Sequence, residues 1–190
     1  MALNDKNENR RQIEAAHKAL IVGLAKNQRG AELSGTKVDK KLVHKTMAEN
    51  VLIAQPIALD PGRGIYRTKL IADLSHPFFF DHPLGHLPGI LLLEAVRQFG
   101  TALSHLFYNT PFDSQFILDE INSRFIAEVS SDRETVIDGV VTDVVLKKHV
   151  LRSMKGTAYI CQNDRVLGMI ASTWSIVPAK VMARLDNKFH

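Results

Sequence analysis

The sequence has a single cysteine and no long apolar run, and each of these features excludes certain kinds of protein or site. Cys161 is the only cysteine among 190 residues, which excludes an intramolecular disulfide and any site built on several thiolates. We interpret it as a small buried apolar residue of a strand. Apolar runs such as Ile90 to Leu93 are far shorter than the roughly 20 residues that span a bilayer. Residues 1–12 are polar and lack the apolar region of a secretory signal, so we expect a cytoplasmic protein without a membrane partner.

The charge is weakly basic and does not indicate a nucleic-acid partner. The formal net charge is +4, and the basic residues are scattered, with no Lys/Arg run that has aromatic residues between the charges. A nucleic-acid protein usually concentrates its basic residues on one face. The charge suits an acidic partner such as an acyl carrier protein or a phosphorylated substrate. Solubility explains the same charge equally well.

The composition and the pattern of residues predict one domain with an N-terminal appendage. With 45% hydrophobic and 23% charged residues, the chain is typical of a soluble globular protein. Apolar residues recur at helical spacing between Glu8 and Lys26, which predicts an amphipathic helix. A polar linker follows at residues 28–41, where glycines break the helix. We therefore assign residues 1–41 to the helix and linker, and residues 42–190 to the domain.

The domain itself has the pattern of an α+β fold with an antiparallel sheet. Two strands, at residues 50–59 and 64–72, flank the turn signal Asp60-Pro61-Gly62-Arg63 and predict a hairpin. A strongly apolar helix is predicted at residues 89–107, and Asn109-Thr110-Pro111 ends it. Four strands are predicted after the helix, at residues 115–129, 135–147, 150–162 and 166–177. This order favours a single hotdog fold, an antiparallel sheet wrapped around one long central helix, although the pattern alone does not separate it from other sheet-on-helix folds.

The central helix carries a polar stripe. At 100° per residue, one face gathers Glu94, Arg97, Gln98, Thr101 and His105. Periodicity alone favours an ordinary amphipathic helix whose polar face meets water, with an exposed i,i+3 ion pair. Against this interpretation stands the loop before the helix, residues 75–88, which is rich in histidine, proline and aromatic residues. Such a loop is better suited to a shaped pocket than to a solvated linker.

These groups match the needs of acyl-thioester chemistry. A carboxylate such as Glu94 can act as a general base, and a nearby histidine such as His82 can exchange protons near neutral pH. Backbone amides at the helix start, beside Pro88 and Gly89, can hold a thioester oxygen as charge develops on it. His76, His82 and His86 suggest a metal site more weakly, because proline separates them, and we expect neither a metal nor a cofactor. The sequence also lacks a G-x-S-x-G nucleophile elbow.

Three motifs together resemble the A-factor biosynthesis hotdog family. They are His76-Pro-Phe-Phe-Phe-Asp-His-Pro, His86-Leu-Pro-Gly and Leu92-Leu-Glu-Ala-Val-Arg-Gln98. Leu42-Val-His-Lys-Thr and Asn50-Val-Leu-Ile resemble the opening of that family, and the likeness runs from about Val43 to Val141. The chain is more distantly similar to β-hydroxyacyl-carrier-protein dehydratases, in which the positions of His82, Glu94 and Gln98 hold the catalytic histidine, the acid and a glutamine. The loop between His82 and Glu94 is shorter here, which favours transfer over dehydration.

The resemblance implies an acyltransferase. It would move a β-ketoacyl group from an acyl carrier protein or coenzyme A thioester to a hydroxyl of dihydroxyacetone phosphate, on the way to a γ-butyrolactone. Glu94 or His82 would take the hydroxyl proton, Arg97 would assist the phosphate, and His86, Pro88, Gly89 and Gln98 would complete the substrate site. A-factor-type proteins carry two hotdog units, so a homodimer is expected here. A dehydratase, a thioesterase and a non-catalytic acyl-binding domain remain as alternatives.

Overall fold

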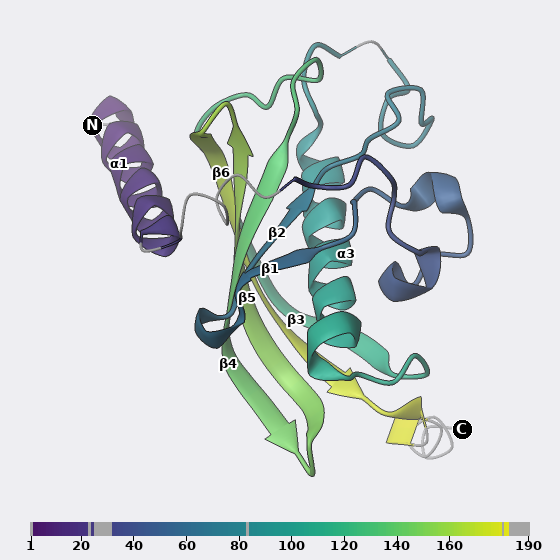
Figure 1. Ribbon diagram of the computed structural model, residues 1–190. Coiled ribbons are helices and arrows are strands. Elements are labelled where there is room, and N and C mark those ends of the chain that lie inside the picture. The colour runs from purple at the N-terminus through teal and green to yellow at the C-terminus, as the bar shows by residue number, and fades with distance from the viewer. Residues whose placement is uncertain (1, 23, 25–31, 83, 180, 183–190) are drawn as a thin grey trace.

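The protein is built on one six-stranded antiparallel sheet with a helix on each face (Figure 1). The computed structural model describes residues 2–22, 24, 32–82, 84–179 and 181–182. The sheet order is β1-β2-β4-β5-β6-β3. Its strands are β1 (Ile57–Asp60), β2 (Ile65–Lys69), β3 (Gln115–Phe125), β4 (Val136–Lys147), β5 (Val150–Gln162) and β6 (Arg165–Val177). The helices are α1 (Ala2–Ile21) and α3 (Gly89–Tyr108), with short 3-10 turns at Lys40–Val43, Ala48–Asn50 and Pro61–Arg63.

The predicted elements are present, with shifted ends. The hairpin turn forms because the Asp60 carboxylate accepts the Arg63 amide and Gly64 adopts a left-handed φ of 67°. The first predicted strand is much shorter than expected, since only residues 57–60 pair as β1 and residues 53 and 54 form isolated bridges. Pro56 directly precedes β1 and has no amide for a ladder bond. The α1 helix begins six residues before the predicted start and ends at Ile21, and residues 25–26 of the prediction lie outside the described residues.

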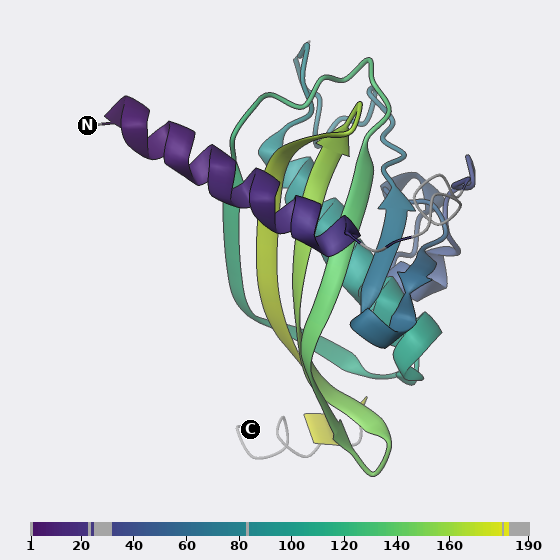
Figure 2. The ribbon, with the colours of Figure 1, turned by 60° about the vertical axis from the view of Figure 1, so that its left-hand side comes forward.

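The two faces of the sheet bury two separate apolar clusters. On β5, Ala158 and Ile160 belong to the cluster beneath α3, whereas Tyr159 and Cys161 belong to the cluster beneath α1. This alternation is what a strand buried on both faces requires. The α1 helix crosses the outer face of the sheet with Ile13 and Leu20 against it (Figure 2). The expected N-terminal helix is therefore part of the folded structure.

The central helix lies very close to the inner face of the sheet. An added Cβ at Gly139 on β4 would lie 2.7 Å from Cε1 of Phe99, and one at Gly100 on α3 would lie 3.0 Å from the Trp174 ring. Such contacts leave no room for a larger residue. The sheet curves around α3 (Figure 1), so the α+β hotdog fold is confirmed. None of the described helices is both long and apolar enough to cross a membrane.

Candidate active site

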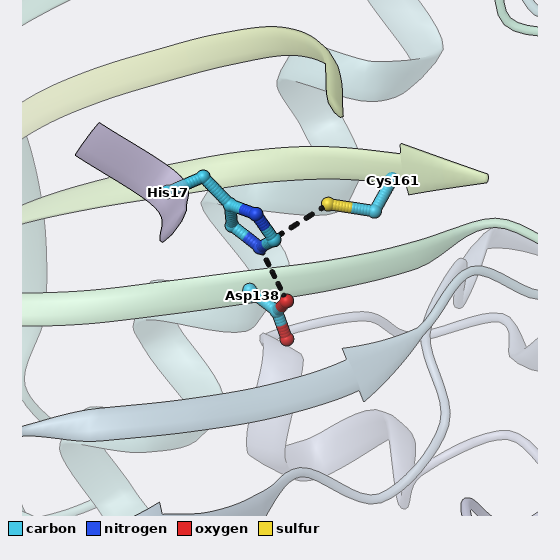
Figure 3. Close-up of side chains that lie close together, drawn as sticks. All are labelled: His17, Asp138 and Cys161. Carbon is cyan, nitrogen blue, oxygen red and sulfur yellow. Dashed lines mark hydrogen bonds and ion pairs between the residues drawn. The ribbon is translucent and has the colours of Figure 1, made fainter. Parts of the chain in front are cut away.

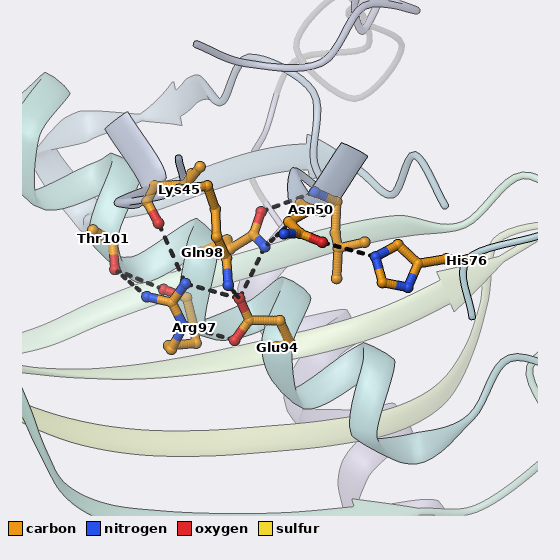
Figure 4. A network of polar contacts seen from close by, with 9 residues as sticks. Lys45, Asn50, His76, Glu94, Arg97, Gln98 and Thr101 are labelled. Carbon is orange, nitrogen blue, oxygen red and sulfur yellow. Dashed lines mark hydrogen bonds and ion pairs between the residues drawn. The ribbon is translucent and has the colours of Figure 1, made fainter. Parts of the chain in front are cut away.

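Glu94 lies in the first half of α3 and receives hydrogen bonds from three side chains (Figure 4). Arg97 binds it with two bonds, Nε to Oε2 at 2.7 Å and Nη2 to Oε1 at 2.8 Å. Lys45 places Nζ 2.8 Å from Oε1, and Gln98 donates from Nε2 to the same oxygen at 2.9 Å. The predicted stripe is thus a network directed at one carboxylate.

Gln98 connects this carboxylate to the segment that precedes β1. Its Nε2 also donates to the backbone oxygen of Asn50 at 2.8 Å, and its Oε1 accepts the Leu52 amide at 2.9 Å. The side chain of Gln98 is fully buried, and a buried amide needs such partners. His76 extends the network, with Nε2 2.8 Å from Oδ1 of Asn50. The Phe78 amide donates to Nδ1 of His76 at 3.3 Å, so Nε2 carries the proton.

The surroundings of Glu94 stabilise its ionised form. Burial alone would raise its pKa, but the bonds and charges of Arg97, Lys45 and Gln98 outweigh burial and lower the pKa to about 2. The carboxylate is therefore an anion at every physiological pH. Because two cations and an amide occupy its oxygens, the carboxylate is a weak base in this arrangement.

Two cavities meet at Glu94 and Ile90. The first, of about 320 Å³, is lined mostly by apolar side chains, among them Leu93, Leu118 and Trp174. The second, of about 490 Å³, is polar on one side and is lined by Lys45, Asn50, His76, Phe78 and Phe79 as well as Ile90 and Glu94. The carboxylate thus lies between an apolar compartment and a polar one.

The start of α3 lies at the same place. The amides of Leu91 and Leu92 already donate to the Pro88 oxygen, at 3.1 and 3.3 Å. Gly89 and Ile90 are the first two helical residues, and their amides have no acceptor within the helix. Gly89 is exposed. Such amides hold an oxyanion well, because the helix dipole adds to their hydrogen bonds.

The structure separates the predicted site residues into two groups. Glu94, Arg97 and Gln98 form one network, with Pro88 and Gly89 at the adjoining helix start. His82 is 69% exposed, and its Nδ1 lies 2.7 Å from the Asp81 carboxylate. His86 pairs its backbone with Ser130. Neither histidine lines the two cavities that meet at Glu94, so the catalytic assignment of His82 stays a prediction.

The sequence analysis did not single out Lys45 and Asn50, and it gave His76 only a weak metal role. Lys45 and Asn50 come from short turns before β1, and His76 comes from the loop before α3. Their distance in the chain from Glu94 hides the contact, and no local spacing reports it. The available signal was the family likeness at residues 42–46 and 50–53, because these two segments contain Lys45 and Asn50.

The last residue of the polar stripe pairs with another histidine instead of meeting water. Nε2 of His105 lies 2.9 Å from Nε2 of His44, and Nδ1 of His105 lies 2.7 Å from the Thr110 oxygen. A carbonyl only accepts, so His105 donates from Nδ1 and accepts at Nε2 from His44. Burial lowers the pKa of both histidines, and for His44 the charges of His105 and Arg97 lower it further. The pair is therefore neutral in the folded protein.

The sequence matches a known family over most of its length. The sequence model of the A-factor biosynthesis hotdog domain matches residues 27–178. A segment of 50 residues is 42% identical to the 2-oxo-3-(phosphooxy)propyl 3-oxoalkanoate synthase of Streptomyces virginiae. That match covers 25% of this chain and only 17% of the synthase.

Solved structures support the same fold. A thioesterase from Haemophilus influenzae superimposes with a TM-score of 0.51 at 14% identity, over 77% of this chain and 95% of its own. A hot-dog-like protein from Thermanaerovibrio acidaminovorans gives a TM-score of 0.51 at 10% identity, over 66% of this chain and 90% of its own. At such identities the likeness shows the fold alone.

Proposed function

Because this chain belongs to the A-factor biosynthesis hotdog domain family, we propose that it is an acyltransferase acting on acyl thioesters. It moves a β-ketoacyl group from an acyl carrier protein or coenzyme A thioester to a hydroxyl of a phosphorylated acceptor such as dihydroxyacetone phosphate. The observation that carries the proposal is the meeting of an apolar and a polar cavity at Glu94. This transferase needs room for an apolar acyl chain and for a polar acceptor. A thioesterase needs a cavity for the acyl chain only, because its second substrate is water.

The apolar cavity suits the acyl chain. Its walls come from α3 and from β3 and β6, and Trp174 of β6 is one of the lining residues. Burial of each methylene contributes about 0.8 kcal/mol, so a chain of several carbons is held firmly there. The thioester carbonyl then lies at the helix start, where the Gly89 and Ile90 amides stabilise its oxyanion.

The polar cavity suits the phosphorylated acceptor. Lys45 supplies a charged donor to a phosphate, and His76 lines the same cavity. The name of the Streptomyces virginiae relative describes a phosphooxy product. When the phosphate attracts Lys45, one cation leaves Oε1 of Glu94, and the carboxylate gains the basicity that it lacks without substrate. Arg97 keeps the carboxylate oriented. Because Arg97 lines the apolar cavity and not the polar one, its contact with the phosphate stays a prediction from the family resemblance.

The transfer step then balances without a cofactor. The acceptor hydroxyl oxygen attacks the thioester carbon while Glu94 takes the hydroxyl proton. The tetrahedral intermediate collapses, the carbon–sulfur bond breaks, and the proton passes from Glu94 to the thiolate that leaves. The products are a β-ketoacyl ester and a free thiol.

A second copy of this chain completes the apolar cavity in the proposed homodimer. The edge strand β3 exposes Ile117, Leu118, Ile121 and Phe125, each at least 40% accessible. An open apolar edge strand favours pairing with another strand. Leu118 and Ile121 also line the apolar cavity, so a two-fold partner on β3 closes it.

The test is thiol release from a β-ketoacyl thioester, with and without dihydroxyacetone phosphate. We expect release that requires the acceptor and falls at least a hundredfold in Glu94→Ala, with the exposed Glu128→Ala as the matched control. Acceptor-independent release would contradict transfer and indicate a thioesterase. Loss of water from a β-hydroxyacyl thioester would indicate a dehydratase. No turnover by folded wild type that still binds the thioester would indicate an acyl-binding domain.

The same assay distinguishes the two histidines. His82→Ala tests the residue predicted from the dehydratase likeness, and His76→Ala tests the residue that lines the polar cavity. Because His76 contacts Asn50 and Glu94 shares its cavity, we expect the larger fall in kcat/KM, about tenfold or more, in His76→Ala. A larger fall in His82→Ala would support His82 as the catalytic histidine. It would also imply that the loop before α3, which carries His82, closes over the substrate.

A further inference from the structure

Three buried side chains with metal-ligating atoms converge on the face of the sheet opposite the proposed active site (Figure 3). His17 comes from α1, Asp138 from β4 and Cys161 from β5. Nε2 of His17 lies 2.8 Å from Oδ2 of Asp138 and 3.5 Å from Sγ of Cys161. One ligand atom from each of the three residues lies within 4.8 Å of the others, and the residues are 7%, 1% and 6% exposed. A single ring nitrogen thus faces both a carboxylate oxygen and a sulfur.

One spacing of the cluster fits a small tetrahedral ion as it stands, and the other fits after a small opening. With metal–nitrogen and metal–sulfur bonds of about 2.0 and 2.3 Å, the edge of a tetrahedron from nitrogen to sulfur is about 3.5 Å, the separation found here. The corresponding nitrogen–oxygen edge is about 3.3 Å, so the 2.8 Å pair opens by roughly half an ångström. The single proton on Nε2 can form a good hydrogen bond with either the Asp138 carboxylate or the Cys161 sulfur, but not with both. A metal ion can bind the nitrogen, the oxygen and the sulfur together.

Arg67 fixes the carboxylate in the orientation that a ligand needs. Its Nε donates to Oδ1 of Asp138 at 2.6 Å, and its Nη2 donates to Oδ2 at 3.0 Å. Oδ2 retains a second lone pair, which points at His17. Carboxylate ligands are commonly held by such an outer hydrogen bond, which orients them and tunes their basicity.

A cavity on the open side of the cluster provides access and a further ligand. It has a volume of about 300 Å³, and besides the three ligands it is lined by Arg67, Glu134, Asn163 and Asp164. Asp164 belongs to the turn between β5 and β6. A water in the cavity can supply the fourth ligand that a tetrahedral ion requires, whereas the exposed Asp164 lies outside the cluster of three and would have to turn toward it.

We propose that His17, Asp138 and Cys161 bind one divalent transition-metal ion of the zinc class, which fastens α1 to the outer face of the sheet. Imidazole and thiolate donors favour such an ion over magnesium or calcium. On binding, the thiol proton of Cys161 leaves to solvent and the imidazole proton moves from Nε2 to Nδ1, so no electron transfer is involved. Burial raises the pKa of the Cys161 thiol, so the thiol stays protonated until the ion displaces its proton.

The site is independent of the proposed acyl transfer. It lies under α1, whereas Glu94 lies on α3 across the sheet. From the sequence, His76, His82 and His86 were the residues that suggested a metal site, and Cys161 was expected to be a small buried residue of a strand. Residues 17, 138 and 161 are too far apart in the chain for any spacing motif to report them.

The test is titration of the untagged chain of 190 residues with Co²⁺, a spectroscopic stand-in for zinc. We expect one ion per chain and a near-ultraviolet sulfur-to-cobalt charge-transfer band. Cys161→Ser should lose that band, and His17→Ala should weaken binding at least tenfold. The exposed His149→Ala serves as the matched control and should behave as wild type. Circular dichroism verifies that each variant is folded.

Two results would overturn the proposal. One is folded wild type that takes up less than a tenth of an ion per chain in excess Co²⁺, which would leave the cluster as an ion pair that docks α1. The other is a charge-transfer band that survives in Cys161→Ser. As a second readout, Zn²⁺ should raise the thermal midpoint of wild type but not that of His17→Ala.

Discussion

At the scale of single residues, Glu94 is a carboxylate kept from acting as a base by its own neighbours. Two cations and an amide occupy its oxygens. Lys45 is the neighbour that a substrate moves most readily, because it has a flexible stem and lines the polar cavity, whereas Arg97 is also bonded to the Val43 oxygen. In the proposed mechanism the phosphate of the acceptor activates Glu94 by withdrawing Lys45. Water carries no phosphate, so it would not activate Glu94 in this way.

Lys45→Met tests this role of the lysine. The substitution keeps the length of the stem but removes a charge-assisted bond to the phosphate, which contributes about 1.5–3 kcal/mol. We expect the KM for dihydroxyacetone phosphate to rise at least tenfold while the KM for the thioester stays unchanged. Steady-state kinetics measure both, with the exposed Lys41→Met as control. An unchanged acceptor KM would place the phosphate elsewhere.

The His44–His105 pair predicts a loss of stability in mild acid. The pKa of each histidine is lowered on folding, so this contribution to the free energy of unfolding is complete above the unfolded pKa of about 6.5. It is lost as the pH falls from there toward the folded pKa, because the unfolded chain binds the protons first. Urea unfolding at pH 7.5 and 5.5 should show a smaller pH dependence in His105→Gln than in wild type or His149→Gln. Equal slopes in all three would exclude the pair as the cause.

At the scale of elements, the close approach of α3 to the sheet positions the site. Gly139→Ala on β4 places a methyl group against the Phe99 ring, at a distance of 2.7 Å before relaxation. Such overpacking typically costs about 1–3 kcal/mol, and we expect a fall of that size in the free energy of unfolding by urea. Gly85→Ala is the matched control, since its added Cβ meets no atom within 4 Å. Equal stability of the two variants would mean that the helix shifts freely.

The same scale explains which features could be predicted. The order of strands and α3 follows from periodicity and turn residues, and the polar stripe of α3 from helical geometry, because both are local. Only part of the surroundings of Glu94 is local. Arg97 and Gln98 bind it from the next turn of the same helix, whereas Lys45 reaches it from the segment before β1. Asn50 and His76 share its polar cavity, and the composition of the loop before α3 indicates a pocket without showing which residues line it. The predicted first strand, residues 50–59, is too long. Its apolar residues 51–54 are buried, as those of a strand would be, but they do not belong to β1.

At the scale of the whole molecule, the open apolar edge of the sheet supports the proposed homodimer. Ile121→Arg places a charge on β3 and should convert the proposed dimer to a monomer in light scattering at micromolar concentration. Val145→Arg is the matched control, because Val145 is 52% exposed on β4, away from that edge. A monodisperse wild-type monomer would contradict the dimer, and dissociation by Val145→Arg would move the interface to the β4–β5 hairpin.

The central claim is that two substrates occupy two cavities on opposite sides of one carboxylate. The most direct measurement is a crystal structure with glycerol phosphate and a non-cleavable β-ketoacyl analogue, in which a methylene group replaces the thioester sulfur. We expect the acyl chain against Trp174, the carbonyl oxygen that stands for the thioester oxygen at the Gly89 amide, and the phosphate at Lys45, with Lys45 withdrawn from Glu94. An acyl chain outside the apolar cavity, or a phosphate bound while Lys45 still contacts Glu94, would contradict it.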